Sequence, residues 1–243
     1  MSTIYLIRHG QAGSRENYDQ LSEMGQRQAR LLGEHWATRA MGFDAVYAGG
    51  MVRQQLTARI AIGAMTRMAA ATEGIETDAR WNEFSLRSVY EWMAPRLAAT
   101  DARFARDFEE MQREIQADPH SVRGAAGRCD RAVIEAWMAD RHPTTEIESW
   151  DSFRARVLRG FDDLLARHFQ TETQTQIAIF TSVTPIAVCL GRALGLENEK
   201  ILRLMAVIYN SSVTVMKIRF GEPLLFHFNA TPHLHDDALL SFR

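Results

Sequence analysis

The first apolar run of the chain is followed by two side chains that can act on phosphate. The run covers residues 4–7 and predicts a buried strand, because tyrosine and β-branched residues suit a pleated surface. It is followed directly by Arg8, His9 and Gly10. An arginine guanidinium presents a planar fork of donors to phosphate oxygens, and a neutral imidazole can be a nucleophile toward phosphorus. Gly10 lacks a Cβ, so the chain can turn there and its backbone can approach a ligand closely.

The position of this pair at the end of a strand favours a site over the alternative, a surface pair beside a turn. Open α/β sheets bind their ligands at the carboxyl ends of the strands, where loops from several strands converge on one crevice. Further candidates lie just beyond other predicted strands, namely Arg53 after residues 43–47, Glu83 after residues 74–78, and Ser182 after residues 176–180. We expect these side chains to meet, although Glu83 could equally be a solvated carboxylate at a strand end.

Composition excludes several classes of protein. The chain has 243 residues, of which 46% are hydrophobic and 24% charged, enough for a large core and untypical of disorder. Its formal charge of -2 argues against a dominant surface for nucleic acid or anionic membrane, so we expect neither as a partner.

The cysteines and the apolar segments indicate a cytoplasmic location. Cys129 and Cys189 are too few for a disulfide framework and lack metal-ligand spacing, which is typical of a reducing compartment. Arg8 interrupts the first apolar run after a handful of residues, so the run does not resemble a secretion signal. No segment approaches the apolar length that crosses a bilayer.

The alternation of strands and helices predicts a three-layer α/β/α sandwich over residues 1–243, treated as a single domain. Ser22 is a plausible N-cap for a helix that ends near residue 40. Residues 212–218 and 224–228 flank a Gly-Glu-Pro turn and predict a hairpin, which would give a mostly parallel sheet an antiparallel edge strand.

The middle of the chain, about residues 85–148, has a different pattern. It is rich in alanine, arginine, glutamate and methionine and has no convincing strand. We predict two or three helices that are inserted into the α/β framework and form a cap over the site. A strongly amphipathic helix follows, in which Phe153, Val157 and Phe161 recur every four residues and predict a core-facing stripe.

Three segments carry a family resemblance through their order and spacing. They are residues 6–12 (LIRHGQA), 19–29 (DQLSEMGQRQA) and 46–58 (VYAGGMVRQQLTA). Together they resemble the histidine phosphatase superfamily, the phosphoglycerate-mutase-like proteins. The resemblance covers residues 1 to about 90 and again the chain from about 149 onward.

The resemblance implies a role for each candidate. His9 would be the nucleophile that forms a phosphohistidine, and Arg8 and Arg53 would clamp the phosphate. Glu83 would donate a proton to the leaving oxygen. This fits the chemistry, because a transferring phosphoryl group chiefly needs positioned positive charge around its oxygens. No cofactor is implied.

The sequence departs from the family pattern at Ser182. The family usually carries a second histidine followed by glycines there, whereas this chain has Ser182, Val183 and Thr184. A serine hydroxyl can still donate one hydrogen bond to a phosphoryl oxygen, but it brings no charge. Hydrogen bonds to charged groups are worth about 1.5–3 kcal/mol against about 1 for neutral pairs, so we expect a rate deficit on the order of tenfold to a hundredfold.

The sequence therefore predicts a phosphomonoester hydrolase that acts on a small phosphorylated substrate through His9. Gln11 and Asn17 are close enough to His9 in sequence to touch the substrate. The alternative is a catalytically impaired protein that keeps the fold and binds a phosphate ligand or has a regulatory role. The Ser182-Val183-Thr184 run suggests this alternative, and the retention of Arg8, His9 and Arg53 together opposes it. A phosphoglycerate mutase is disfavoured, because the full mutase pattern around the second histidine is missing. A homodimer is allowed but not indicated.

A second group of histidines has less support as a site. His233, His235 and Asp236 could be written as metal ligands, but no third cluster supports a metal and phosphohistidine chemistry needs none. Residues 231–234 resemble the closing segment of the family, which indicates a structural role. We expect no metal.

Overall fold

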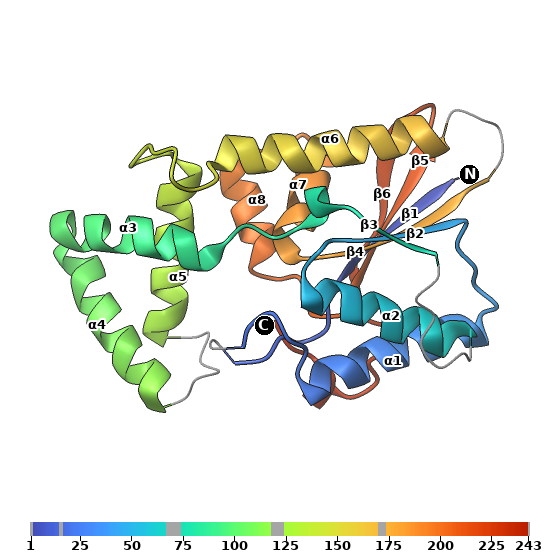
Figure 1. Ribbon diagram of the computed structural model, residues 1–243, viewed down its shortest axis with the longest axis horizontal. Coiled ribbons are helices and arrows are strands. Elements are labelled where there is room, and N and C mark those ends of the chain that lie inside the picture. Colours follow the sequence, from blue (N-terminus) through green and yellow to red (C-terminus); the bar gives the residue numbers. More distant parts are fainter. Residues whose placement is uncertain (1, 15–16, 67–73, 118–123, 170–173, 243) are drawn as a thin grey trace. The chain divides into compact units, whose positions relative to one another are not determined.

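A six-stranded mixed sheet forms the framework of the larger part of the chain (Figure 1). The computed structural model describes residues 2–14, 17–66, 74–117, 124–169 and 174–242. The strand order is β3-β2-β4-β1-β5-β6. The strands are β1 (Thr3–Arg8), β2 (Ala45–Ala48), β3 (Ile75–Thr77), β4 (Gln176–Thr181), β5 (Val213–Arg219) and β6 (Glu222–Ala230). The first four run parallel to one another, whereas β5 is antiparallel to β1 and β6 to β5.

Helices cover both faces of this sheet, which confirms the predicted three-layer α/β/α architecture (Figure 1). On one face lie α1 (Glu23–Thr38) and α2 (Val52–Thr66). The other face is covered by α7 (Val183–Leu194), α8 (Asn198–Met205) and α6 (Trp150–His168), the last from residue 156 onward. The parallel strands thus end together at one edge, between two helical layers.

Local sequence signals explain where the helices begin and end. Ser22 is the N-cap of α1, and its Oγ accepts a hydrogen bond from the backbone N–H of Gly25 at 3.0 Å. Gly195 ends α7 in the left-handed region at a φ of 62°, which glycine adopts without a Cβ penalty. The predicted hairpin is present as β5 and β6.

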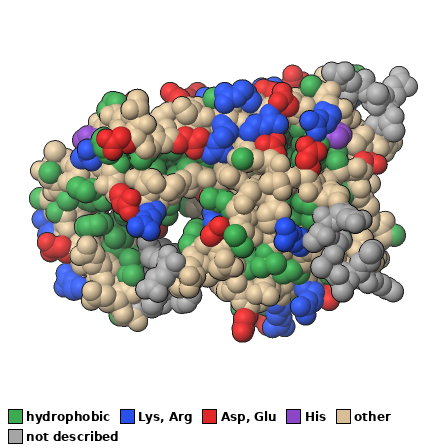
Figure 2. Space-filling model, viewed as in Figure 1, with side chains coloured by type: hydrophobic (Ala, Val, Ile, Leu, Met, Phe, Trp, Pro, Cys, Tyr) green, Lys and Arg blue, Asp and Glu red, His purple; other side chains and the backbone are tan. Residues whose placement is uncertain are grey.

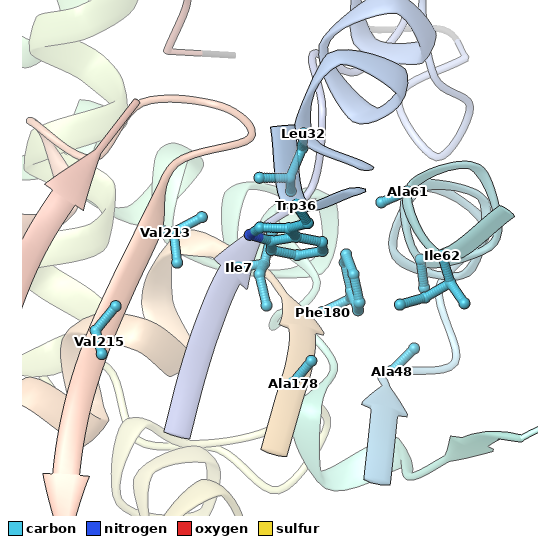
Figure 3. Packing of buried hydrophobic residues seen from close by; sticks show 11 residues of the cluster. Ile7, Leu32, Trp36, Ala48, Ala61, Ile62, Ala178, Phe180, Val213 and Val215 are labelled. Carbon is cyan, nitrogen blue, oxygen red and sulfur yellow. The ribbon is translucent and has the colours of Figure 1, made fainter. Parts of the chain in front are cut away.

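The apolar cluster between the sheet and the first helical pair holds the strand ends in place (Figure 3). Trp36 of α1 packs edge to face on Phe180 of β4, with ring centroids 6.2 Å apart, and Ile7 of β1 belongs to the same cluster. Fully burying such a side chain contributes about 1.5–3 kcal/mol. The cluster therefore anchors the carboxyl ends of β1 and β4, which the candidate residues Arg8, His9 and Ser182 adjoin.

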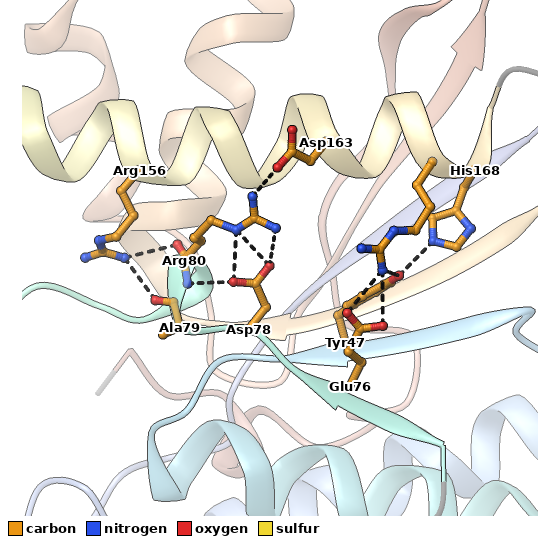
Figure 4. Close-up of polar contacts among 9 residues, drawn as sticks. Tyr47, Glu76, Asp78, Ala79, Arg80, Arg156, Asp163 and His168 are labelled. Carbon is orange, nitrogen blue, oxygen red and sulfur yellow. Dashed lines mark hydrogen bonds and ion pairs between the residues drawn. The ribbon is translucent and has the colours of Figure 1, made fainter.

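Polar contacts tie β2, β3 and the residues after β3 to α6 (Figure 4). Arg167 donates to Glu76 of β3 at 3.1 Å and to the Tyr47 hydroxyl of β2 at 3.3 Å. Closer to the strand ends, Arg80 pairs with Asp78 at 2.8 Å and with Asp163 of α6. These contacts fix the chain segment that follows β3.

Residues 84–155 form a second compact unit, distinct from the unit made by residues 1–83 and 156–243. It contains α3 (Leu86–Thr100), α4 (Ala102–Ala117) and α5 (Gly124–Met138), and its described residues include no strand. Aromatic packing forms its core, with the Phe84 and Trp137 rings stacked at 4.4 Å. The second unit is slightly longer than the insertion expected at 85–148. The assignment of the whole chain to one domain, with these helices as a cap, stays a prediction.

The surface and the helices bear on the expected partners. On the face shown in Figure 2, basic and acidic side chains are interspersed and do not gather by sign. Among the residues that the structure describes, none of the helices is both long enough and apolar enough to cross a membrane.

Gly33 allows α1 and α2 to pack closely. A Cβ added to Gly33 would lie 2.1 Å from the carbonyl oxygen of Ala61 and 2.8 Å from the Cβ of Ala64. Side-chain rotation cannot relieve a clash with backbone, so we expect Gly33→Ala to lower the free energy of unfolding by about 1–3 kcal/mol, despite the better helix propensity of alanine. Urea unfolding measures this change.

Gly42→Ala is the matched control, since no described atom lies within 4 Å of a Cβ added at Gly42. This variant should unfold at an unchanged or higher urea concentration. Equal stability of Gly33→Ala and the unchanged protein would contradict the close approach of the two helices.

Candidate active site

Strand β1 delivers Arg8 and His9 to the carboxyl edge of the parallel strands. Arg8 lies opposite Thr181 of β4 in the strand register, and the backbone N–H of His9 donates to the carbonyl oxygen of Thr181 at 2.9 Å. The chain then turns at Gly10, where an added Cβ would lie 2.4 Å from the carbonyl oxygen of Gly25. A larger residue does not fit, so glycine is required for the turn that presents His9.

The partners of His9 define its protonation state. Nδ1 lies 2.7 Å from the carbonyl oxygen of Gly10, which can only accept, so Nδ1 carries the hydrogen. Nε2 is then the unprotonated nitrogen, and it accepts a hydrogen bond from Nε of Arg53 at 3.2 Å. Burial lowers the pKa of His9 well below its usual range, and the charges of Arg53 and Arg8 lower that pKa further. His9 is therefore a neutral imidazole whose lone pair lies at Nε2.

Arg53 connects this imidazole to a carboxylate. It lies at the start of α2 with 3% of its surface exposed, and its Nη1 donates to Oδ1 of Asp19 at 2.9 Å. Asp19 also accepts from the backbone N–H of Val52 at 3.2 Å. The Arg53 guanidinium lies over the ring of Tyr18, 4.9 Å from its centroid. These contacts hold the guanidinium against His9.

Arg8 is a second buried cation in the same site. Its Nη2 donates to the carbonyl oxygen of Phe242 at 2.7 Å and its Nη1 to that of Ile208, while its Nε has no partner among the described residues. Burial lowers the pKa of Arg8 to about 10, and the nearby acidic groups Tyr18 and Glu83 oppose that shift. Arg8 therefore stays charged at neutral pH and keeps one N–H for an anion.

Glu83 lies at the N-terminus of α7. Its Oε2 accepts from the backbone N–H of Thr184 at 3.1 Å, and its charge affects the pKa of Arg8. The carboxylate therefore occupies the position of a helix cap within the electrostatic range of one guanidinium.

The segment before Glu83 is anchored from two sides. Arg156 of α6 donates from Nη1 to the carbonyl oxygens of Arg80 at 3.0 Å and Ala79 at 3.3 Å (Figure 4). It also donates to the carbonyl oxygen of Asn82 at 3.0 Å. On the other side the carbonyl oxygen of Trp81 accepts from Oγ1 of Thr181 at 2.6 Å. These contacts hold in place the irregular segment that carries the Glu83 carboxylate.

Ser182 is buried at the end of β4, with 1% of its surface exposed. Its Oγ accepts a hydrogen bond from Nε2 of Gln54 at 2.8 Å. Gln11 is half-buried, and its Oε1 accepts from Oγ of Ser22 at 2.7 Å, whereas Asn17 is exposed in the loop. The structure thus brings His9, Arg53 and Arg8 together; the roles assigned to all seven candidate residues stay predictions.

Sequence reasoning missed several residues that hold these candidates. Asn210 donates from Nδ2 to the carbonyl oxygens of His9 at 3.2 Å and Gly10 at 3.5 Å, and nothing in its local pattern indicates that contact. Asp19 and Gln54 lie within the segments quoted for the family resemblance. Gln54 follows Arg53 directly, which is the signal that could have identified it.

His233 supports the site indirectly. It is 1% exposed, and its Nε2 lies 3.0 Å from Oγ of Ser211, whose backbone N–H donates to the carbonyl oxygen of His9 at 3.1 Å. The described residues contain no group of histidine, cysteine, aspartate and glutamate side chains that could hold a metal ion. This position is consistent with the structural role expected for His233.

Burial, with smaller effects of His35 and His235, lowers the pKa of His233 to about 3. Between that value and 6.5 the unfolded chain binds a proton here that the folded chain does not, so the folded state loses stability as the pH falls. The contribution is up to about 1.4 kcal/mol per pH unit. We expect His233→Asn to show a shallower decline in urea stability below pH 6.5 than the unchanged protein. Equal slopes would show that His233 is not a buried neutral group.

Comparison with known proteins places the fold. A family model described as Histidine phosphatase superfamily (branch 1) matches residues 4–147 and 125–231. A phosphoserine phosphatase variant from Entamoeba histolytica, solved with phosphoserine, has a TM-score of 0.61 at 16% identity, covering 96% of this chain and 100% of that one. The phosphoglycerate mutase of Bacillus anthracis has a TM-score of 0.61 at 16% identity, covering 96% of this chain and 95% of that one. A mycobacterial glucosyl-3-phosphoglycerate phosphatase has a TM-score of 0.57 at 17% identity, covering 95% of this chain and 100% of that one.

Proposed function

We propose, since this chain belongs to the histidine phosphatase superfamily (branch 1), that it hydrolyses phosphomonoesters through a phosphohistidine formed at Nε2 of His9. The observation that carries the proposal is the state of His9, which is a neutral imidazole with its lone pair directed at Nε of Arg53. A nucleophile for phosphorus must be unprotonated, and the surrounding positive charge must be ready for the phosphoryl oxygens.

In the first step, Nε2 of His9 attacks phosphorus and the ester oxygen leaves, taking a proton from Glu83, which would enter the reaction in its protonated form. In the second, water attacks the phosphohistidine, gives its proton back to Glu83, and releases inorganic phosphate and the imidazole. The same carboxyl group serves as acid and then as base. Arg8 and Arg53 both lower the pKa of His9, and both would attract the negative charge of the phosphoryl oxygens.

Substrate binding would exchange partners at Arg53. The N–H that Arg53 donates to Nε2 of His9 at 3.2 Å must move to a phosphoryl oxygen before Nε2 can attack. Nη1 can stay on Asp19, which keeps the guanidinium plane in place during the exchange. Arg8 would contribute its unpartnered Nε–H.

A second candidate function is a protein that binds phosphorylated ligands without turnover. The observation that favours it is the neutral Ser182 at the end of β4, where the family usually has a second histidine. The loss of that charge would weaken stabilisation of the transferring group. The retained arrangement of His9 and Arg53 favours the enzyme.

The proposal includes a cytoplasmic location. Cys129 and Cys189 are free and buried, and burial raises the pKa of the Cys129 thiol to about 11 and that of Cys189 further. Two inert, buried thiols are suited to a reducing compartment.

The test is a phosphate-release assay of the purified protein on a panel of phosphomonoesters, with the phosphoenzyme trapped by an alkaline quench, which preserves a phosphohistidine. We expect slow turnover and an acid-labile phosphoenzyme, and we expect His9→Ala to abolish both because no other nucleophile replaces the imidazole. His142→Ala is a matched control in the second unit and should leave both unchanged. Binding of phosphorylated ligands without any phosphoenzyme on His9 would reject the enzyme and leave the binding protein.

A further inference from the structure

Gln54 is a buried side chain whose amide orientation is determined by its backbone partners. It has no exposed surface. Its Oε1 accepts from the backbone N–H of Met51 at 3.3 Å, and its Nε2 donates to the carbonyl oxygen of Trp81 at 3.1 Å. Because a peptide N–H only donates and a carbonyl only accepts, the amide cannot be reversed. Nε2 must therefore face Ser182.

This orientation determines what the Ser182 hydroxyl can do. Its Oγ accepts from Nε2 of Gln54 at 2.8 Å, so its own hydrogen is left for another acceptor. A serine that precedes a helix usually accepts from an N–H of the first turn, but Ser182 makes no such bond. That N–H, on Thr184, donates to Glu83 instead. Within the described residues, Gln54 is the side-chain partner of the hydroxyl.

Both residues lie next to the contacts of His9. Ser182 follows Thr181, whose carbonyl oxygen accepts from the backbone N–H of His9 at 2.9 Å. Gln54 follows Arg53, whose Nε donates to Nε2 of His9 at 3.2 Å. The backbone contact through Thr181 and the side-chain contact through Arg53 therefore place Ser182 and Gln54 one residue away from direct partners of His9.

We propose that Gln54 is a positioning residue, which keeps the Ser182 hydroxyl as a hydrogen-bond donor to the transferring phosphoryl group. The inference rests on the proposed function, because it assigns this donor to the phosphoryl group on His9. A lone hydroxyl can rotate. The N–H of Gln54 occupies one lone pair of Oγ and limits that rotation, so the hydroxyl hydrogen needs less reorganisation during the reaction.

A double-mutant cycle tests this role. It compares the unchanged protein with Gln54→Met, Ser182→Ala and the double variant, for kcat and for the affinity of orthovanadate measured by calorimetry. Methionine keeps the length of glutamine but donates nothing. We expect each single change to lower kcat by roughly 10- to 100-fold, because a hydrogen bond to a charged group is lost or misdirected. The double variant should be no worse than Ser182→Ala within about twofold.

Gln55→Met is the matched control for removing a glutamine amide from α2. Nε2 of Gln55 donates to the carbonyl oxygen of Gly49 at 2.7 Å and to Oγ1 of Thr77 at 3.0 Å, and neither partner is Ser182. This variant should retain kcat and vanadate affinity. Ser182→Thr keeps the hydroxyl and should retain more activity than Ser182→Ala in the presence of Gln54, but not in its absence.

The outcomes separate this inference from the proposed function. Independent effects that multiply in the double variant would show that Gln54 acts by general packing, and would overturn its positioning role. If the protein without substitutions shows neither turnover nor a phosphoenzyme, the proposed phosphatase function is rejected. In that case a non-additive cycle in vanadate affinity would still support Gln54 as the residue that orients Ser182, and an additive one would reject it.

Discussion

The site depends on keeping one imidazole neutral and aligned in the presence of two buried cations. The hydrogen bond from Nδ1 of His9 to the carbonyl oxygen of Gly10 selects the tautomer, and burial beside Arg8 and Arg53 lowers the pKa of the ring. The tautomer and the lowered pKa of His9 both depend on the fold around the ring. Without the turn at Gly10 the carbonyl would not face Nδ1, and without burial the guanidinium charges would be screened by water.

Two guanidinium groups in a buried site are costly, and the fold meets that cost in two ways. Arg53 has a partly exposed carboxylate partner in Asp19, so its charge is offset locally. Arg8 has backbone carbonyls, those of Phe242 and Ile208, which stabilise the cation without neutralising it. An anion entering the site thus meets one arginine that is already balanced and one that is not.

Near these charges, the N-terminus of α7 does not follow the usual capping pattern, in which the N-cap side chain accepts from the first turn of its own helix. Glu83, rather than Ser182, satisfies the first turn of α7, and Gln54 takes the hydroxyl that the helix would otherwise use. Arg156 holds the segment before Glu83 through the carbonyl oxygens of three residues. The apolar cluster that contains Trp36, Ile7 and Phe180 packs against the ends of the strands from which this network extends. A buried polar network of this kind is stable only when its members are satisfied together.

The sequence by itself determined the α/β architecture and named the candidate residues, whose roles stay predictions. Period and capping signals located the strand before Arg8 and the cap at Ser22, because these depend on residues close together in the chain. Strand ends then predicted which candidates would lie at one edge. The tertiary structure decided the state of those candidates: the tautomer of His9, the pairing of Arg53 with Asp19, and the donor role of Gln54 toward Ser182. A hydrogen bond between residues distant in sequence depends on which backbone donor or acceptor the packing places opposite it, and local pattern contains no record of that choice.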